Sequence, residues 1–174
     1  MVVTMVIIAV LFGNCTVVKP NAKTEIEPPY RVVYVILMEC KISQAMTPHL
    51  RDITEKYGPS GQFDFIAYFP ESFLADDADL QQWAVDYDLS MSCLVDSNDQ
   101  ITQALGASRA PQVIVTNQHT SEILYSGRIN NLFAALGKRR PDVTDHTLEK
   151  VLQQIIDGET VSPKTTEVIG CALN

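Results

Sequence analysis

The sequence predicts an α/β fold in which helices cover both faces of a mixed central sheet. Two apolar runs of strand length, Val32–Met38 and Phe63–Phe69, are separated by a helical pattern, which is typical of a βαβ unit with parallel strands. Two later runs, Gln112–Asn117 and Ile123–Gly127, flank a short turn and predict an antiparallel hairpin. An amphipathic helix over Thr144–Ile156 follows the hairpin.

The helix between the first two strands is predicted over Thr47–Tyr57, where apolar residues such as Leu50 recur at helical spacing. Pro48 would be costly deep inside a helix, but it is tolerated near a helix start, where the N–H groups have no carbonyl partner within the helix, or at a kink. A second helix is expected over Ala78–Tyr87.

Shorter elements complete the order. Ser92–Asp96 has strand character, and Asp99–Leu105 predicts a short helix. The basic residues 138–140 are expected in a solvated loop. Thr144 suits the N-cap of the last helix, and Gly158 follows its end.

The chain of 174 residues is long enough for one domain with terminal extensions. We expect a signal or lipoprotein segment over residues 1–15, a linker over 16–30, one folded domain over 31–158 and a tail over 159–174. With 46% hydrophobic and 20% charged residues, the chain can bury a core.

The first 13 residues are apolar and uncharged, and a bilayer span needs about 20 residues. They fit the hydrophobic part of a signal peptide, and Cys15 stands where a bacterial lipoprotein cysteine would be lipidated. A lipid anchor at Cys15, a cleaved secretory signal and an uncleaved anchor remain open. The expected location is therefore extracytoplasmic, in the periplasm or cell envelope, where disulfides persist.

The net charge of −8 argues against nucleic acid as a partner, since such binding needs a basic face. His49, His119 and His146 are scattered without metal-ligand spacing, and neither a Gly-rich phosphate loop nor a serine-hydrolase elbow occurs in the sequence. We therefore expect no metal and no cofactor.

Cys40 is the residue that points most directly to chemistry. It follows the first predicted strand, where a helical segment begins, and unpaired N–H groups at such a turn favour thiolate over thiol. The positive charge of Lys41 also favours the thiolate, whereas the negative charge of Glu39 disfavours it. Because both neighbours are charged, they argue for an exposed cysteine. A buried, inert thiol is the alternative. Ser43 stands three residues on, where a redox motif would have a second cysteine.

The chain resembles the redoxin type of thioredoxin-fold proteins over residues 31–157. The resemblance rests on Glu39-Cys40-Lys41-Ile42-Ser43-Gln44, on Pro48, on Arg109-Ala110-Pro111-Gln112 before the hairpin, and on Val168-Ile169-Gly170-Cys171. It is closest to extracytoplasmic bacterial thioredoxin-like proteins, and it implies a three-layer α/β/α sandwich. Ser43 departs from the family pattern, in which this position holds the resolving cysteine; the peroxidase branch also needs a cysteine there.

The resemblance implies catalytic roles for Cys40 and Ser43. Cys40 would attack a disulfide, and Ser43 could donate a hydrogen bond to its thiolate. It also implies that Pro111 is cis and that the Ala110 backbone pairs with an extended substrate strand. Cys171 remains a resolving cysteine, a structural disulfide partner or a free thiol.

Two functions follow. The first is a cell-envelope thiol–disulfide oxidoreductase with the single attacking cysteine Cys40, acting on protein thiols and disulfides or on small thiols. The second is a non-catalytic thioredoxin-fold binding or accessory module. A role in metal or haem maturation rests on family analogy alone. Cys93, in a strand-like alternation, is expected in the core.

Overall fold

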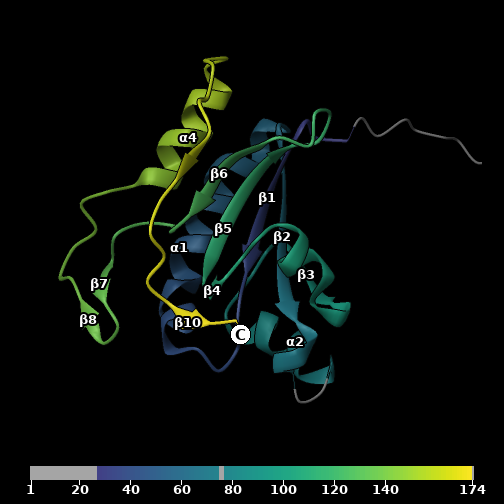
Figure 1. Cartoon of the computed structure of the whole chain (residues 1–174), viewed down its shortest axis with the longest axis vertical. Coiled ribbons are helices and arrows are strands. Elements are labelled where there is room, and N and C mark those ends of the chain that lie inside the picture. Colours follow the sequence, from purple (N-terminus) through teal and green to yellow (C-terminus); the bar gives the residue numbers. More distant parts are fainter. Residues whose placement is uncertain (1–26, 75–76, 174) are drawn as a thin grey trace, which may run out of the picture.

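A six-stranded mixed sheet in the order β3-β2-β1-β5-β6-β9 forms the centre of the computed structural model, which describes residues 27–74 and 77–173 (Figure 1). β1 runs parallel to β2 and antiparallel to β5, and β5 runs antiparallel to β6. These pairings confirm the predicted βαβ unit and hairpin. The strands of this sheet are β1 Tyr30–Val35, β2 Phe63–Pro70, β3 Ser92–Asp96, β5 Gln112–Asn117, β6 Ile123–Gly127 and β9 Lys164–Thr165.

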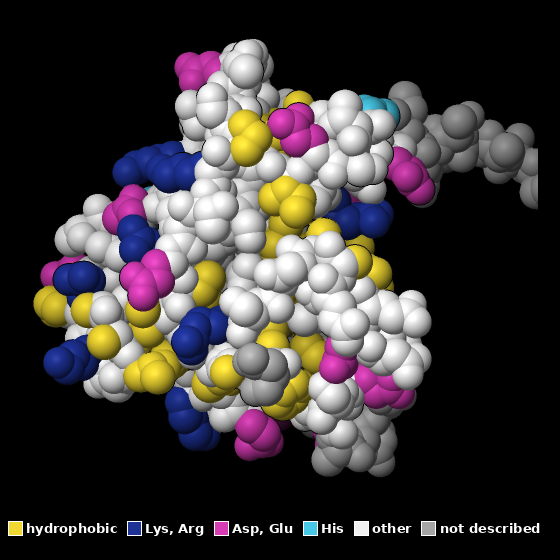
Figure 2. All heavy atoms as spheres, in the orientation of Figure 1, with side chains coloured by type: hydrophobic (Ala, Val, Ile, Leu, Met, Phe, Trp, Pro, Cys, Tyr) yellow, Lys and Arg dark blue, Asp and Glu magenta, His cyan; other side chains and the backbone are white. Residues whose placement is uncertain are grey.

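Two small sheets lie outside it. β4 Arg109–Ala110 pairs with β10 Cys171–Ala172, and β7 Phe133–Ala135 pairs with β8 Lys138–Arg139. Of the basic residues 138–140, which were expected in a loop, Lys138 and Arg139 therefore form a strand, and Arg140 lies outside it. Lys and Arg side chains gather on that side of the molecule (Figure 2). The helices are α1 Lys41–Tyr57, α2 Asp77–Asp86, α3 Gln100–Ala104 and α4 Thr147–Ile156, and 3-10 turns cover η1 Gly58–Ser60, η2 Glu71–Phe73 and η3 Ser97–Asp99.

The core divides between the two faces of the sheet because neighbouring strand residues point to opposite sides. On one face, Val32 and Tyr34 pack with apolar residues of α1 and α4, including Leu50 and Leu152. On the other face a smaller cluster forms from Val33, Val35 and Ile114, with Leu105, Ala107 and Leu173 against it. Leu173 of the C-terminal tail packs against both clusters.

α1 begins at Lys41, six residues before the predicted start, and Pro48 lies inside it. Proline has no N–H, so the carbonyl of Gln44, four residues earlier, loses its helical donor. The Thr47 hydroxyl donates to that carbonyl at 2.8 Å, while Pro48 itself is exposed. The side-chain donor lets the helix continue through the proline, and the prediction of a start at Thr47 was wrong for this reason.

The start of α4 also differs from the prediction. The helix begins at Thr147 rather than Thr144. The Thr144 N–H instead donates to the Asn131 side-chain oxygen at 2.9 Å, and the Asn131 amide donates to the Thr144 hydroxyl at 2.8 Å. Thr144 is therefore fixed against the segment after β6 and does not cap the helix.

The C-terminal tail returns to the sheet. It leaves α4, pairs with β6 through β9, and reaches β4 through β10, as the yellow segment in Figure 1 shows. In the described part of the chain, no helix combines the length and the apolar character needed to cross a bilayer.

Candidate functional site: the Cys40–Cys171 junction

Cys40 is the N-cap of α1, and its carbonyl accepts the first helical hydrogen bond, from Gln44 N at 2.9 Å. Its own backbone is extended and its side chain makes no capping bond. The sequence produces this geometry because a buried β-branched strand ends just before a long amphipathic helix. Cys40 therefore lies where the partial positive charge of unpaired helical N–H groups is concentrated.

Cys40 forms a disulfide with Cys171, which is 131 positions further along the chain, and their Cα atoms are 6.2 Å apart. Glu39 and Lys41 are exposed, as expected, but Cys40 itself is only 3% exposed. The tail covers it, so the expectation of an exposed Cys40 was wrong. Cys171 is partly exposed and is the more accessible member of the pair.

The tail holds Cys171 in place through strand pairing. Cys171 lies opposite Ala110 in the β4–β10 ladder. On either side of that pair, Leu173 N donates to Ser108 O at 3.1 Å, and the Arg109 guanidinium donates to Gly170 O at 3.1 Å. Cys171 is thus presented to Cys40 by an ordered strand.

The Ala110–Pro111 peptide bond is cis, and Ala110 is fully buried. Cys40 Sγ lies 3.5 Å from the Ala110 carbonyl oxygen. In the disulfide this sulfur has no proton, so the contact becomes a hydrogen bond only after reduction to the thiol. The resemblance implied an Ala110 backbone available to a substrate strand; in this structure β10 of the same chain takes that place.

Gly170 makes the close approach of the tail to β4 sterically allowed. A Cβ atom added at this position would lie 2.7 Å from the Ala110 carbonyl carbon, closer than real Cβ contacts. Any other residue would push the tail away from Ala110. The glycine before Cys171 is therefore a requirement of the pairing.

A second anchor fixes the tail four residues earlier, at Thr166. Thr166 N donates to Ser126 O at 3.1 Å, and its hydroxyl lies 2.7 Å from the Tyr125 hydroxyl and accepts from Arg128 N at 3.1 Å. Between the anchors, residues 167–169 line a groove of about 470 Å³, together with Gln112 and Ser126. The tail is therefore held at both ends and forms part of the groove wall between them.

Ser43 is buried at 1% exposure, one turn into α1. Its hydroxyl oxygen accepts a hydrogen bond from Leu37 N at 3.4 Å. That bond ties the end of the β1 segment to α1. The implied hydrogen bond from Ser43 to a Cys40 thiolate is not formed in this oxidised arrangement.

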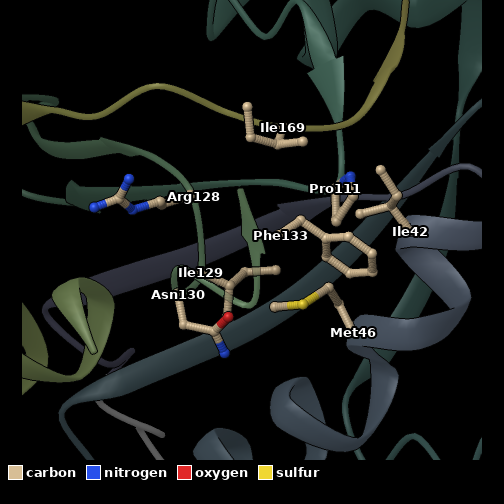
Figure 3. Close-up of a pocket in the computed structure, with 8 residues that line it drawn as sticks. All are labelled: Ile42, Met46, Pro111, Arg128, Ile129, Asn130, Phe133 and Ile169. Atoms are coloured by element: carbon tan, nitrogen blue, oxygen red, sulfur yellow. The ribbon is translucent and has the colours of Figure 1, made fainter. Parts of the chain in front are cut away.

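A small apolar pocket lies beside the disulfide, and its lining residues come from four parts of the chain (Figure 3). α1 contributes Ile42 and Met46, the cis-proline loop Pro111, and the region after β6 Ile129 and Phe133. Ile169 of the tail lines the same pocket from another side, and Arg128 and Asn130, on either side of Ile129 in the sequence, complete the lining. The space left among them measures about 20 Å³, room for one water molecule and no further side chain.

Cys93 lies far from this arrangement in sequence and in role. It sits on β3, the edge strand, is half-buried against the core, and is a free thiol. Burial raises the pKa of the Cys93 thiol to about 11. It therefore stays protonated and unreactive near neutral pH.

Other candidate groups do not converge. His119 lies in an exposed turn, and His49 and His146 line a separate surface hollow with Glu149. In residues 27–74 and 77–173, no three His, Cys, Asp or Glu side chains group as metal ligands. Cys15 lies outside the described residues.

Comparison with solved structures identifies the fold. A hypothetical protein from Sinorhizobium meliloti 1021 superposes with a TM-score of 0.71 at 19% identity, covering 84% of this chain and 80% of that one. A Chlorobium tepidum protein, described as "a putative Thiol:disulfide interchange protein DsbE", superposes with a TM-score of 0.57 at 14% identity, covering 76% of this chain and 83% of that one. A thioredoxin-like protein from Aeropyrum pernix gives 0.53 at 16% identity over 75% and 80%.

The chain has a thioredoxin-like fold. This confirms the fold class that the sequence predicted. No family model and no curated protein matches the chain. In this thioredoxin-like frame, Cys40 and cis Pro111 face one another at the end of the sheet, and the tail is added across them.

Several residues of the site were missed by the sequence argument. Arg109, Thr166 and Ile169 hold the tail or line the pocket, but none carries a motif of its own. Phe133 also gave no signal, because a single aromatic residue after the hairpin has no distinguishing pattern. The one available signal was Val168-Ile169-Gly170-Cys171, in which a glycine beside a cysteine suggests a close backbone approach.

Proposed function

We propose that this protein is a thiol–disulfide oxidoreductase in which Cys40 attacks and Cys171 resolves. The observation that carries the proposal is the Cys40–Cys171 disulfide at the N-terminus of α1, against the cis-Pro111 loop. Ser43 replaces the usual resolving cysteine, and the sequence left Cys171 open as a resolving cysteine, a structural disulfide partner or a free thiol. Cys171 takes the resolving role from the other end of the chain.

The chemistry balances with two cysteines and an external disulfide. With both cysteines reduced, the Cys40 thiolate attacks a substrate disulfide, forms a mixed disulfide and releases one substrate thiolate. The Cys171 thiolate then attacks the Cys40 sulfur, re-forms the Cys40–Cys171 bond and releases the second substrate thiolate. Two electrons pass from the protein dithiol to the substrate, and the reverse sequence oxidises a substrate dithiol. The substrates are protein thiols and disulfides or small thiols.

One observation favours a second candidate, a binding module with a structural disulfide. Cys40 is 3% exposed under the tail, and this is the environment of an inert cystine. In that case the disulfide only secures the tail. The two candidates differ in whether the bond turns over.

The deciding experiment compares turnover among cysteine variants. Reduced wild-type protein is mixed with a protein disulfide such as insulin, and Cys40 is followed by mass spectrometry. The Cys171→Ser variant should accumulate a mixed disulfide at Cys40, whereas wild type should return to the Cys40–Cys171 form. Cys93→Ser is the matched control and should behave like wild type. If Cys171→Ser forms no mixed disulfide with insulin or with a small disulfide, the oxidoreductase proposal is wrong.

We further infer an extracytoplasmic location with a lipid anchor at Cys15. Support comes from the uncharged apolar residues 1–13 before Cys15 and from a long-range disulfide, which an oxidising compartment preserves. Expression of the full chain with a labelled fatty acid tests the anchor. Label should be incorporated into wild type and lost in Cys15→Ser.

A further inference from the structure

The tail occupies the site in the way a bound partner segment would. It is extended, it pairs antiparallel with β4, and it places Cys171 in covalent contact with Cys40. Two residues before that cysteine, Ile169 lines the apolar pocket beside Pro111 (Figure 3). The protein therefore carries its own example of a segment that fits this site.

We propose that the protein selects partner segments of the pattern apolar-Gly-Cys, and that the tail 167–173 is an internal copy of that pattern which leaves when the partner binds. This inference rests on the proposed function, since it names the substrate class of the same site. The recognised partner is an extended stretch of another protein with a reactive cysteine.

The apolar position of the pattern follows from the pocket. Ile42, Met46 and Ile129 are nearly inaccessible to solvent, and together with Pro111 and Phe133 they form an apolar wall, while Arg128 and Asn130 lie at its edge. With Ile169 present, only about 20 Å³ is left. A polar side chain there would lose its hydrogen bonds with water and gain few in return, so a branched apolar side chain is preferred.

The glycine position follows from the backbone. A Cβ atom directly before the cysteine would overlap the Ala110 carbonyl, as it would at Gly170. A partner segment in the same register meets the same carbonyl. The selection is therefore for a small residue before the cysteine, in addition to an apolar residue before that.

The ability of the tail to leave follows from how it is held. Strand pairing and the Arg109 contact hold residues 170–173, and Thr166 holds the other end. Between these points, residues 167–169 border the open groove of about 470 Å³, and Glu167 is exposed. Reduction breaks the Cys40–Cys171 bond, which is the only covalent cross-link between the tail and the rest of the described residues. A partner segment then competes with the tail for the same pocket.

The test uses the full chain with Cys15→Ser, Cys93→Ser and Cys171→Ser, which leaves Cys40 as its one thiol. The probes are peptides Glu-Val-Xaa-Gly-Cys-Ala-Leu whose cysteine carries a thionitrobenzoate disulfide. The Cys40 thiolate attacks the peptide cysteine, forms the mixed disulfide and releases coloured thionitrobenzoate. The peptide with Ile at Xaa should react about tenfold faster than the peptide with Ser, as expected for burying one aliphatic side chain. Replacing the peptide glycine by alanine should slow the reaction by a similar factor.

Two protein variants, Phe133→Ala and Ile169→Ser, should change the rate for the Ile peptide in opposite directions. Phe133→Ala opens the pocket and should bring the Ile-to-Ser ratio toward one, while Phe73→Ala, at an exposed phenylalanine outside the pocket lining, should leave the ratio unchanged. Ile169→Ser weakens the tail as a competitor and should raise the rate for the Ile peptide. A merely structural effect would not give this pair of opposite results.

The failures can be told apart. If Cys40 reacts with a small disulfide but all peptides react at one rate, the selection pattern is wrong and the oxidoreductase proposal stands. If Cys40 reacts with neither, both are wrong. As a last control, Cys171 of a Cys40→Ser chain that also carries Cys15→Ser and Cys93→Ser is given the same thionitrobenzoate disulfide and is mixed with the chain that keeps only Cys40. If Cys40 attacks this Cys171 and releases thionitrobenzoate faster than it does from the Ile peptide, the site binds the tail of a second copy of this chain, and the proposal of a foreign partner is wrong.

Discussion

Cys40 and Cys93 both belong to strand–helix units of one sheet, yet the structure gives them opposite chemistry. Cys40 follows a central strand, caps a long helix and meets Cys171 beside a cis-proline loop. Cys93 is within the edge strand β3, where burial raises the pKa of its thiol to about 11. The difference teaches that burial alone does not decide the state of a cysteine, since Cys40 is the more buried of the two and forms a disulfide, whereas Cys93 is a free thiol. The surroundings of the two cysteines differ: Cys40 lies beside helical N–H groups and a second cysteine, whereas Cys93 has apolar contacts.

Alkylation should show the largest difference. After reduction, Cys93 with a pKa of about 11 holds about 10⁻⁴ of its thiol as thiolate at pH 7, whereas an ordinary cysteine holds a few per cent. We expect Cys40 to be labelled at least about a hundredfold faster than Cys93, as measured by mass spectrometry over time. Between pH 7 and 9, Cys93 labelling should rise about tenfold per pH unit. Equal rates at pH 7 would remove the contrast between the two sites.

The free energy of unfolding should also distinguish the Cys40–Cys171 disulfide from Cys93. The disulfide closes a loop of 131 residues, and such loops contribute about 3–5 kcal/mol in the chain-entropy model. Cys171→Ser should lower the free energy of unfolding by that amount in urea titrations. Cys93→Ser replaces a half-buried edge residue and should cost no more than about 1 kcal/mol. A loss in Cys171→Ser as small as that in Cys93→Ser would show that the disulfide does not constrain the unfolded chain.

Gly170→Ala should weaken the junction without removing either cysteine. The added Cβ overlaps the Ala110 carbonyl, so the tail must move away and the two sulfurs meet less often. We expect the equilibrium between dithiol and disulfide to shift about tenfold toward the dithiol, measured in a glutathione redox titration with thiol trapping. Ala172→Ser is the matched control, because Ala172 is exposed on the same strand, and it should titrate like wild type.

Asp145→Asn should have the smallest effect on stability, and this effect should be confined to the Cys40 side of the molecule. The Asp145 carboxylate accepts hydrogen bonds from the Thr147 hydroxyl at 2.7 Å, the Arg128 guanidinium at 2.6 Å and the Lys150 ammonium group at 3.2 Å. These contacts hold the pKa of Asp145 well below its usual range. Because the folded-state pKa is lowered, the stabilisation is present above the unfolded-state pKa of about 3.9 and is lost as the pH falls through the folded-state value.

The Asn variant should therefore lose about 1 kcal/mol at pH 7, with the difference from wild type shrinking below about pH 4. Urea titrations at several pH values measure it. Cys93 labelling should not change, since Asp145 acts on the segment from Arg128 that also touches Thr166. A constant difference at all pH values would contradict the assigned role of the carboxylate.

Local patterns in the chain were sufficient for the central fold. The hairpin strands Gln112–Asn117 and Ile123–Gly127 have the predicted bounds, and β3 does as well. These segments alternate or run apolar in ways that depend only on neighbours in sequence. The start of α1 was misplaced because the donor that compensates Pro48 is a side chain, Thr47, and no periodicity reveals it.

The sequence by itself determined the thioredoxin-like arrangement of strands and helices and placed Cys40 at the start of a helix. Only the tertiary structure decided that Cys40 is covered, that Cys171 is its partner and that Ile169 lines the pocket beside Pro111. The physical reason is sequence distance. Strand and helix signals are short-range, whereas the junction brings together residues 131 positions apart, and their contact depends on how the tail packs against an already folded sheet.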